Sequence, residues 1–218
     1  KVNQSQKTKM VQNVFNNVTQ KYNLMNDIMS FGTHRLWKKR LIQVMNIQSN
    51  DLILDVGTGT GDITNLIHNN FSKSLIVSLD LNFNMLKAGK EKTKNISNKI
   101  EWINCNAENL PFKNNTFDKY IISFCLRNVT LINKVLCEAL RVLKPGGSFY
   151  CLEFSKPKTS SINRIYNFYK SNIIPIMGSK VAKNKEAYKY LEESISQFPT
   201  QEILSSKLNQ IGFNNISV

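Results

Sequence analysis

Three glycines at alternating positions follow a short apolar segment. They are Gly57, Gly59 and Gly61, in the stretch LDVGTGTGD. Glycine permits a tight turn here and lets a ligand approach the backbone closely. Two acids, Asp55 and Asp62, flank the loop. Their charges would repel a pyrophosphate and attract a ligand that carries positive groups.

Polar residues also follow the next two apolar segments. Asp80 ends LIVSLD, about 20 residues after the loop, where an acid can hydrogen-bond both hydroxyls of a ribose. Asn106 and Ala107 follow IEWIN, where they can contact an adenine. A G-x-G-x-G spacing with flanking acids differs from the dinucleotide pattern G-x-G-x-x-G. It favours S-adenosylmethionine, whose sulfonium and ammonium are positive, and we count Thr60 of the loop among the predicted cofactor ligands.

The segments that position these residues alternate between two periodicities. LILDV, LIVSLD, IEWIN, KYIISFC (119–125) and SFYCLEF (148–154) have the length and composition of buried parallel strands. NKVLCEALRVLKPGG (133–147) has a helical apolar stripe, which its Pro-Gly-Gly should end. This alternation predicts an α/β Rossmann-like fold: a mostly parallel, doubly wound sheet that helices cover on both faces.

We predict one domain over residues 1–218. Its parts are a helical N-terminal cap (1–48), a cofactor-binding core (51–155), a helical substrate-side insertion (156–199), and a last helix with the start of a strand (200–218). The last helix should end at Gly212, a common residue after helices. A short helix should follow His34, and its expected apolar side is Leu36, Trp37, Leu41 and Met45.

Composition narrows the class of protein. A net charge of +14 predicts a surface that attracts anions: nucleic acid, an anionic membrane or an acidic partner. The lysines are scattered, so an ordinary solvated surface is the alternative explanation. No apolar run reaches the ~20 residues of a membrane-spanning helix. The irregularly spaced cysteines indicate reduced, buried thiols in a reducing compartment, with neither disulfides nor a metal site: Cys105, Cys125, Cys137 and Cys151.

Longer stretches resemble the ubiquinone/menaquinone biosynthesis C-methyltransferase family, and within it the mitochondrial ubiquinone branch. KYNLMNDIMSFGTHRLWK (21–38) and RVLKPGGSFYCLEFSKP (141–157) resemble its two signatures. DKYIISFCLRNVT and GSKVAKNKEAYKYLEESI (178–195) also match, so the resemblance covers nearly the whole chain. There are two departures: Asn23 stands where the family usually has Asp, and the family normally continues past Val218 into a final strand or hairpin.

The resemblance implies transfer of a methyl group from S-adenosylmethionine to a ring carbon of 2-methoxy-6-polyprenyl-1,4-benzoquinol, in coenzyme Q synthesis. Demethylmenaquinone is the alternative substrate. The implied location is the matrix face of the mitochondrial inner membrane, or the cytoplasm if the protein is bacterial. A homodimer, or membership of a quinone biosynthesis complex, is also implied.

Carbon methylation of a quinol requires an oriented ring, a polarised hydroxyl and exclusion of water. Arg127 and Asn128 follow the predicted fourth strand, at the edge where Asp80 lies. The permanent charge of Arg127 can stabilise a phenolate or lower the pKa of a bound water, and Asn128 can hold the same oxygen. Alternatively, Arg127 forms a structural ion pair with Asp62 or Glu153.

Three further residues are candidates. Tyr22 closes over the pocket from the N-terminal segment, or it is an aromatic core contact. Ser123 lies on the cofactor side of the fourth strand's end, or it bonds the backbone. His34 lines the substrate side, or it caps or packs the helix before Trp37.

A polyprenyl substrate dissolves in the bilayer, so peripheral contact with an anionic membrane is expected. Residues 162–177 carry an aromatic and apolar stripe, and Trp37 precedes Lys38, Lys39 and Arg40. Aromatic rings beside basic residues suit the membrane interface. Packing of the 162–177 stripe against the core or a second subunit is the alternative.

Two other functions compete with this interpretation. An RNA or DNA methyltransferase fits the basic charge, but amino-methylating enzymes usually carry an Asn/Asp-Pro-Pro-aromatic motif where this chain has FCLRNV. We therefore expect no nucleic-acid partner. A non-catalytic member of a biosynthetic complex would not need the intact glycine loop, Asp80 and Arg127.

Overall fold

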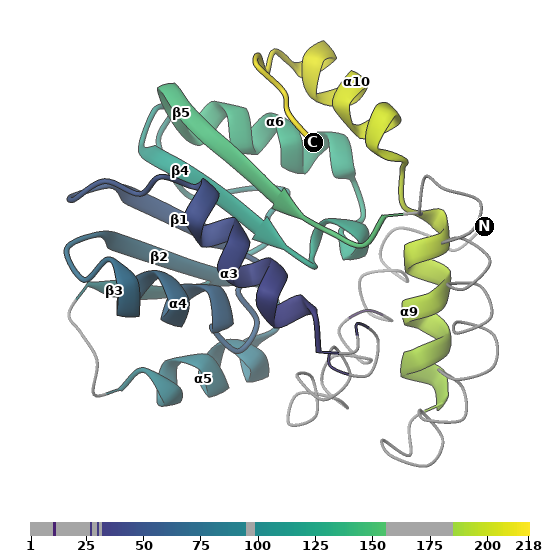
Figure 1. Ribbon diagram of the computed structural model, residues 1–218, viewed down its shortest axis with the longest axis horizontal. Coiled ribbons are helices and arrows are strands. Elements are labelled where there is room, and N and C mark those ends of the chain that lie inside the picture. The colour runs from purple at the N-terminus through teal and green to yellow at the C-terminus, as the bar shows by residue number, and fades with distance from the viewer. Residues whose placement is uncertain (1–10, 12–26, 28–29, 31, 95–98, 156–184) are drawn as a thin grey trace.

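The computed structural model describes residues 11, 27, 30, 32–94, 99–155 and 185–218. Its five strands form one parallel sheet in the order β3-β2-β1-β4-β5 (Figure 1). The chain runs outward from β1 to β3 and then returns to β4, so the switch point lies between β1 and β4. This confirms the predicted Rossmann-like fold. The strands are β1 (Leu52–Val56), β2 (Leu75–Asp80), β3 (Ile100–Asn104), β4 (Phe117–Ser123) and β5 (Leu143–Leu152).

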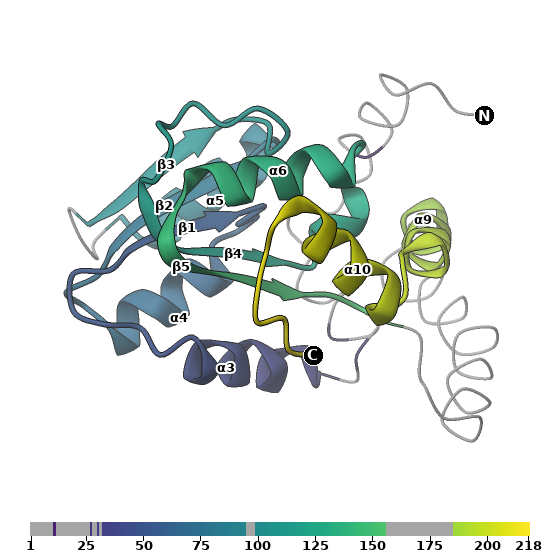
Figure 2. The same ribbon diagram turned by 90° about the horizontal axis from the view of Figure 1, so that it is seen from above.

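Helices cover both faces of the sheet. Figure 2 shows α3 and α4 on one face and α6 on the other. Helix α10 packs on the α6 side, because its Leu208 belongs to the same buried cluster as Leu136 of α6. Among the described residues, the helices are α3 (His34–Val44), α4 (Asp62–Asn70), α5 (Phe83–Lys92), α6 (Ile132–Val142), α9 (Lys185–Gln197) and α10 (Gln201–Ile211), and η2 (Leu126–Asn128) is a 3-10 turn.

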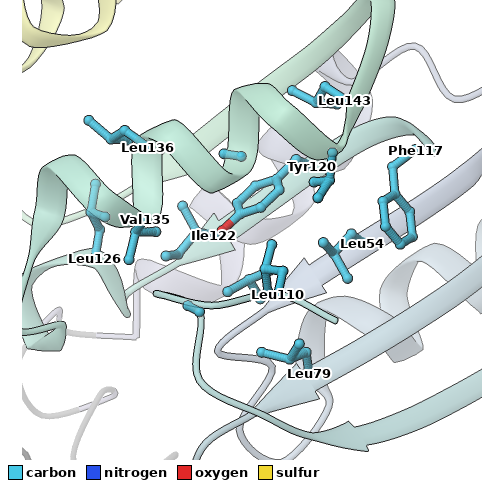
Figure 3. Packing of buried hydrophobic residues seen from close by; sticks show 14 of the residues in the cluster. Leu54, Leu79, Leu110, Phe117, Tyr120, Ile122, Leu126, Val135, Leu136 and Leu143 are labelled. Atoms are coloured by element: carbon cyan, nitrogen blue, oxygen red, sulfur yellow. The ribbon is translucent and has the colours of Figure 1, made fainter. Parts of the chain in front are cut away.

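The alternation of side chains along each strand divides the core into two clusters. Ile53 of β1 and Ile121 of β4 pack with residues of α3 and α4. Their neighbours Leu54, Tyr120 and Ile122 belong to the cluster on the opposite face, beneath α6 (Figure 3). Because both faces of the central strands are buried, the strands are continuously apolar in sequence, as predicted.

Several predicted boundaries were wrong. β4 ends at Ser123, two residues before the predicted end at Cys125. The helix that Pro145 was predicted to stop ends at Val142, and β5 begins at once with Leu143, five residues before the predicted strand start at Ser148. A proline disfavours helical backbone at the residue before it. Pro145 therefore prevents the helix from continuing through Lys144.

The predicted apolar side of α3 was right for Leu41 and Met45, which are buried, and wrong for the other two residues. Leu36 is 64 % exposed and Trp37 is 41 % exposed, whereas His34 and Lys38 are buried together with Leu41. The sequence pattern did not indicate that a lysine would be buried. Lys38 is accommodated because its ammonium lies 2.9 Å from the Asp62 carboxylate, at the start of α4.

At the C-terminal end, α10 ends before Gly212, whose φ of 116° confirms the expected helix-terminating residue. Residues 213–218 contain no strand, so the strand predicted to begin there is wrong. Asn215 has a φ of 54°, which interrupts the extended backbone that a strand requires. Helix α9 agrees with the predicted helical insertion, while residues 1–10, 12–26 and 156–184 lie outside the described residues, and with them most of the predicted cap and insertion.

Candidate active site

The three glycines of the loop have different roles. All have positive φ, which side-chain-bearing residues rarely adopt. A Cβ added to Gly57 would lie 2.2 Å from Sγ of Cys125, and one added to Gly61 would lie 2.6 Å from the ring of Trp102. Gly59 lines an open cavity beside the loop. Gly57 also lines this cavity, whereas Gly61 allows close packing against Trp102 of β3.

This cavity lies at the carboxyl ends of β1, β2, β3 and β4. Ligands of parallel α/β sheets bind at this edge, where the strand order reverses. The predicted cofactor residues Gly57, Gly59, Asp80, Asn106 and Ala107 all line it, as does Asn128. We call it the nucleoside cavity.

Asp80 holds the loop and faces the nucleoside cavity. Its two carboxylate oxygens accept hydrogen bonds from the backbone N–H groups of Gly59 (2.8 Å) and Asn82 (2.7 Å). Burial raises the pKa of this carboxyl to about 6, against the effect of those two donors. Each oxygen can accept a further hydrogen bond, so ribose hydroxyls suit this position.

Thr60 and Ser123, also predicted to bind cofactor, line a different and smaller cavity. Gly57 lines both cavities, so they adjoin. Asp55 lies in the wall of the smaller one and accepts hydrogen bonds of 2.7 Å from the hydroxyls of Thr58 and Thr64. Burial raises the pKa of Asp55.

Arg127 forms a buried ion pair with Glu153 at the end of β5. Its guanidinium also donates to the backbone oxygen of Phe124 (3.0 Å), and its backbone N–H donates to Glu153 (3.2 Å). The structure therefore shows the ion-pair alternative, with Glu153 as the partner. Asp62 instead pairs with Lys38. A role of Arg127 in the reaction stays a prediction.

Asn128 lines the nucleoside cavity and is held on both sides. Its amide nitrogen donates to the backbone oxygen of Phe124 (3.3 Å), and its amide oxygen accepts from the hydroxyl of Tyr190 in α9 (3.0 Å). Phe124 has a φ of 54°, an outlier for an aromatic residue. Strained backbone of this kind is concentrated at functional sites.

An aromatic cluster surrounds Phe124. The ring of Phe154 lies 4.8 Å from it, that of Trp37 6.5 Å and that of His34 6.4 Å. His34 is buried and its Nε2 lies 2.8 Å from Asp27, which favours its packing role. Tyr22 lies outside the described residues.

The cysteines agree in part with the prediction. All four are free thiols, but Cys137 is exposed and the other three are only partly buried. Burial raises the pKa of Cys125, beside Gly57, far above its ordinary value, so this thiol remains protonated. A thiolate is required for nucleophilic attack, so Cys125 does not act as a nucleophile.

The described part of the chain contains neither a cluster of metal-ligating side chains nor a helix that could span a membrane.

Sequence reasoning missed several residues of this site. Glu108 lines the nucleoside cavity, and its carboxylate accepts from the backbone N–H groups of Thr130 (2.8 Å) and Leu131 (3.0 Å). Tyr190 lies within the stretch 178–195, whose family resemblance was the only available signal. The sequence predicts Phe124 as a strand residue and Lys38 as a surface charge, whereas Phe124 follows the end of β4 and Lys38 is buried.

The fold and the nucleoside cavity together define a Rossmann-like protein with a site for a nucleoside-containing ligand. Three solved structures share the fold: a possible histamine N-methyltransferase from Thermotoga maritima, a Haloferax volcanii methyltransferase complex, and a Haemonchus contortus phosphoethanolamine N-methyltransferase bound to S-adenosyl-L-methionine. Their TM-scores are 0.66, 0.67 and 0.63, and their sequence identities 18%, 18% and 19%. They cover 94%, 93% and 84% of this chain, which corresponds to 82%, 75% and 37% of theirs.

The sequence comparison is more specific. A model of the ubiE/COQ5 methyltransferase family matches residues 2–218, so the chain belongs to that family. Its relatives include the ubiquinone/menaquinone biosynthesis C-methyltransferases UbiE of Pasteurella multocida, Cronobacter sakazakii and Rickettsia prowazekii, which are 44%, 45% and 47% identical. Each alignment covers 99% of this chain and, in that order, 82%, 87% and 89% of the relative.

Proposed function

We propose that the protein methylates a ring carbon of a polyprenyl-benzoquinol, specifically 2-methoxy-6-polyprenyl-1,4-benzoquinol, in ubiquinone synthesis. The observation that carries this proposal is the identity of 44–47% to C-methyltransferases named for ubiquinone and menaquinone biosynthesis. The site supports it because the nucleoside cavity and the Arg127–Asn128 turn share one edge of the sheet.

The residues of the chain would share the work as follows. Asp80 would accept the ribose hydroxyls, and Asn106 and Ala107 would contact the adenine. When bound, the cofactor supplies an electrophilic methyl group. Asn128 has a second amide N–H that can donate to an oxygen of the quinol ring. Arg127 would favour negative charge on that oxygen, although Glu153 offsets part of its field.

A direct assay tests the substrate. The purified protein would be incubated with methyl-labelled cofactor and a short-tailed 2-methoxy-benzoquinol, and the product identified by mass spectrometry. We expect one added methyl group on a ring carbon. A demethylnaphthoquinol and bulk tRNA would be offered in parallel. Preference for the naphthoquinol would assign the menaquinone route, and methylated tRNA with an inert quinol would refute the proposal.

We also propose a peripheral contact with an anionic membrane, through the outer side of α3. Leu36 and Trp37 are exposed there beside Lys39 and Arg40. An apolar and aromatic surface with flanking basic residues suits the membrane interface. Lys38, which we had included in this surface, is buried against Asp62 and is excluded from it.

The relatives named above are bacterial proteins, which favours the cytoplasmic alternative over the mitochondrial inner membrane. The mitochondrial location, the homodimer and membership of a quinone biosynthesis complex stay predictions.

A further inference from the structure

The smaller cavity beside the glycine loop contains a buried positive charge. Lys38 is 6 % exposed, and it lines the cavity together with Asp62, Thr60 and Ser123. Because Gly57 lines both cavities, a ligand whose nucleoside lies beside Asp80 could extend past this glycine into the smaller one.

Lys38 has capacity for a ligand. An ammonium has three donors, and Asp62 accepts one of them at 2.9 Å. The same ammonium lies 5.8 Å from the centre of the Phe124 ring. Asp55, the other acid of this cavity, is already bonded by Thr58 and Thr64. Burial of a lysine charge costs free energy, which an anionic ligand would help to recover.

Ser123 provides an independent indication of a ligand. Its hydroxyl oxygen is buried and has no hydrogen-bond partner among the residues that the structure describes. Buried hydroxyls are normally bonded, so this one suits a ligand atom at the same cavity. A hydroxyl and an ammonium on one small cavity are suitable donors for a carboxylate.

We propose that Lys38 and Ser123 bind the carboxylate of the cofactor's methionine part, and that Asp62 positions Lys38 for this contact. The inference rests on the proposed placement of the nucleoside beside Asp80. The proposed contact, which we call the carboxylate anchor, binds the amino-acid end of the cofactor by its charge. Its lysine comes from α3, outside the glycine loop.

Three ligands separate this role from others in a calorimetric binding assay. S-adenosylhomocysteine carries the amino-acid part, 5′-methylthioadenosine lacks it, and decarboxylated S-adenosylmethionine lacks only the carboxylate. We expect Lys38→Met to weaken S-adenosylhomocysteine at least 10-fold and to change methylthioadenosine less than twofold. The wild-type preference for S-adenosylmethionine over its decarboxylated form should disappear in Lys38→Met. Lys39→Met, an exposed neighbour on the same helix, should leave all affinities unchanged.

Two further variants protect the test against misfolding. Lys38→Arg keeps the charge and should retain most of the preference for the carboxylate. Lys38→Met combined with Asp62→Asn leaves neither charge without its partner, and it should weaken S-adenosylhomocysteine at least as much as Lys38→Met does while changing methylthioadenosine less than twofold. Equal weakening of S-adenosylhomocysteine and methylthioadenosine in these variants, or no weakening of either, would refute the carboxylate anchor. Wild-type protein that binds neither ligand would instead refute the cofactor cavity itself.

Discussion

The hydroxyl of Tyr190 in α9 donates a 3.0 Å hydrogen bond to the amide oxygen of Asn128, a residue 62 positions earlier in the chain. Burial raises the pKa of Tyr190 to about 12, so the hydroxyl remains a donor at neutral pH. The bond fixes which side of the Asn128 amide is the acceptor, and leaves its nitrogen to Phe124 and to the cavity. Helix α9 therefore orients a side chain at the sheet edge.

Tyr190→Phe should lower kcat about 10-fold, equivalent to ~1.4 kcal/mol, because the Asn128 amide can then rotate. The affinity for S-adenosylhomocysteine should change less than twofold. Tyr150→Phe is a matched control, since its hydroxyl donates to the backbone oxygen of Met45 (3.1 Å), away from the nucleoside cavity. Both variants should unfold at a lower temperature, but only Tyr190→Phe should be slow. Equal kcat values in the two variants would show that Tyr190 has only a structural role.

Variants of the Arg127–Glu153 pair can separate the contribution of Arg127 to stability from its predicted role in the reaction. Arg127→Ala should destabilise the fold by ~3–5 kcal/mol, because it leaves a carboxylate buried without its partner. Arg127→Met with Glu153→Gln removes both charges and should recover most of that stability in urea unfolding. If Arg127 acts on the chemical step, kcat remains at least about 100-fold low in this stable double variant. Recovered turnover would mean that the pair serves the fold alone.

Much of the fold could be predicted because local patterns determine it. The central strands are buried on both faces, so β1, β2 and β3 appear as apolar segments at their observed bounds. The ends of elements depend on contacts that are distant in sequence. The burial of Lys38 depends on Asp62, 24 residues away, and no periodicity indicates such a pairing.

The site residues also divide into those that local sequence predicts and those that depend on contacts distant in sequence. The cofactor residues beside the glycine loop follow strand ends, and topology alone brings strand ends together. Tyr190 reaches Asn128 from a helix far along the chain, and Arg127 could have met either Asp62 or Glu153. Choosing between two acids requires the three-dimensional distances, which the sequence does not contain.

Asp80 should make cofactor affinity depend on pH. Ribose hydroxyls favour the charged carboxylate, so binding lowers its pKa from about 6 and releases protons near that pH. Affinity for S-adenosylhomocysteine should be constant above pH 6.5 and fall as the pH drops below about 6. Asp80→Ala should weaken binding about 10-fold or more at pH 7.5, and it should abolish the pH dependence. Calorimetry in two buffers of different ionisation enthalpy would count the released protons, and a flat wild-type profile would contradict this role.

His34 should make the free energy of unfolding depend on pH with the opposite sign to Asp80. Burial lowers the pKa of His34 below 6.5, in opposition to its bond with Asp27. Its contribution is therefore fully present above pH 6.5 and is lost as the pH falls, because the unfolded chain binds the proton more tightly. Asp80, whose pKa is raised, gains stability over the same fall in pH.

The difference between wild type and His34→Gln isolates the histidine. Glutamine can still donate to Asp27 but does not titrate. In urea unfolding at pH 7.5 and 5.5, the wild type should lose more free energy of unfolding than His34→Gln does. Equal losses in the two proteins would show that His34 does not titrate differently in the folded and unfolded states.

The outer side of α3 should bind anionic membranes. Each basic residue near such a surface contributes about 1 kcal/mol, so Lys39→Glu with Arg40→Glu should weaken binding to phosphatidylserine vesicles at least ~10-fold in 0.1 M salt. Salt should reduce the difference, because it screens exposed charges. Lys87→Glu with Lys90→Glu, two exposed lysines on α5, changes the net charge equally and should weaken binding far less. A membrane role further requires that the α3 variant turn over a long-tailed quinol in vesicles slowly and a short-tailed quinol in solution at the wild-type rate. Equal losses on both substrates would assign Lys39 and Arg40 to folding or to the active site, and equal effects of the α3 and α5 variants would reduce the attraction to net charge alone.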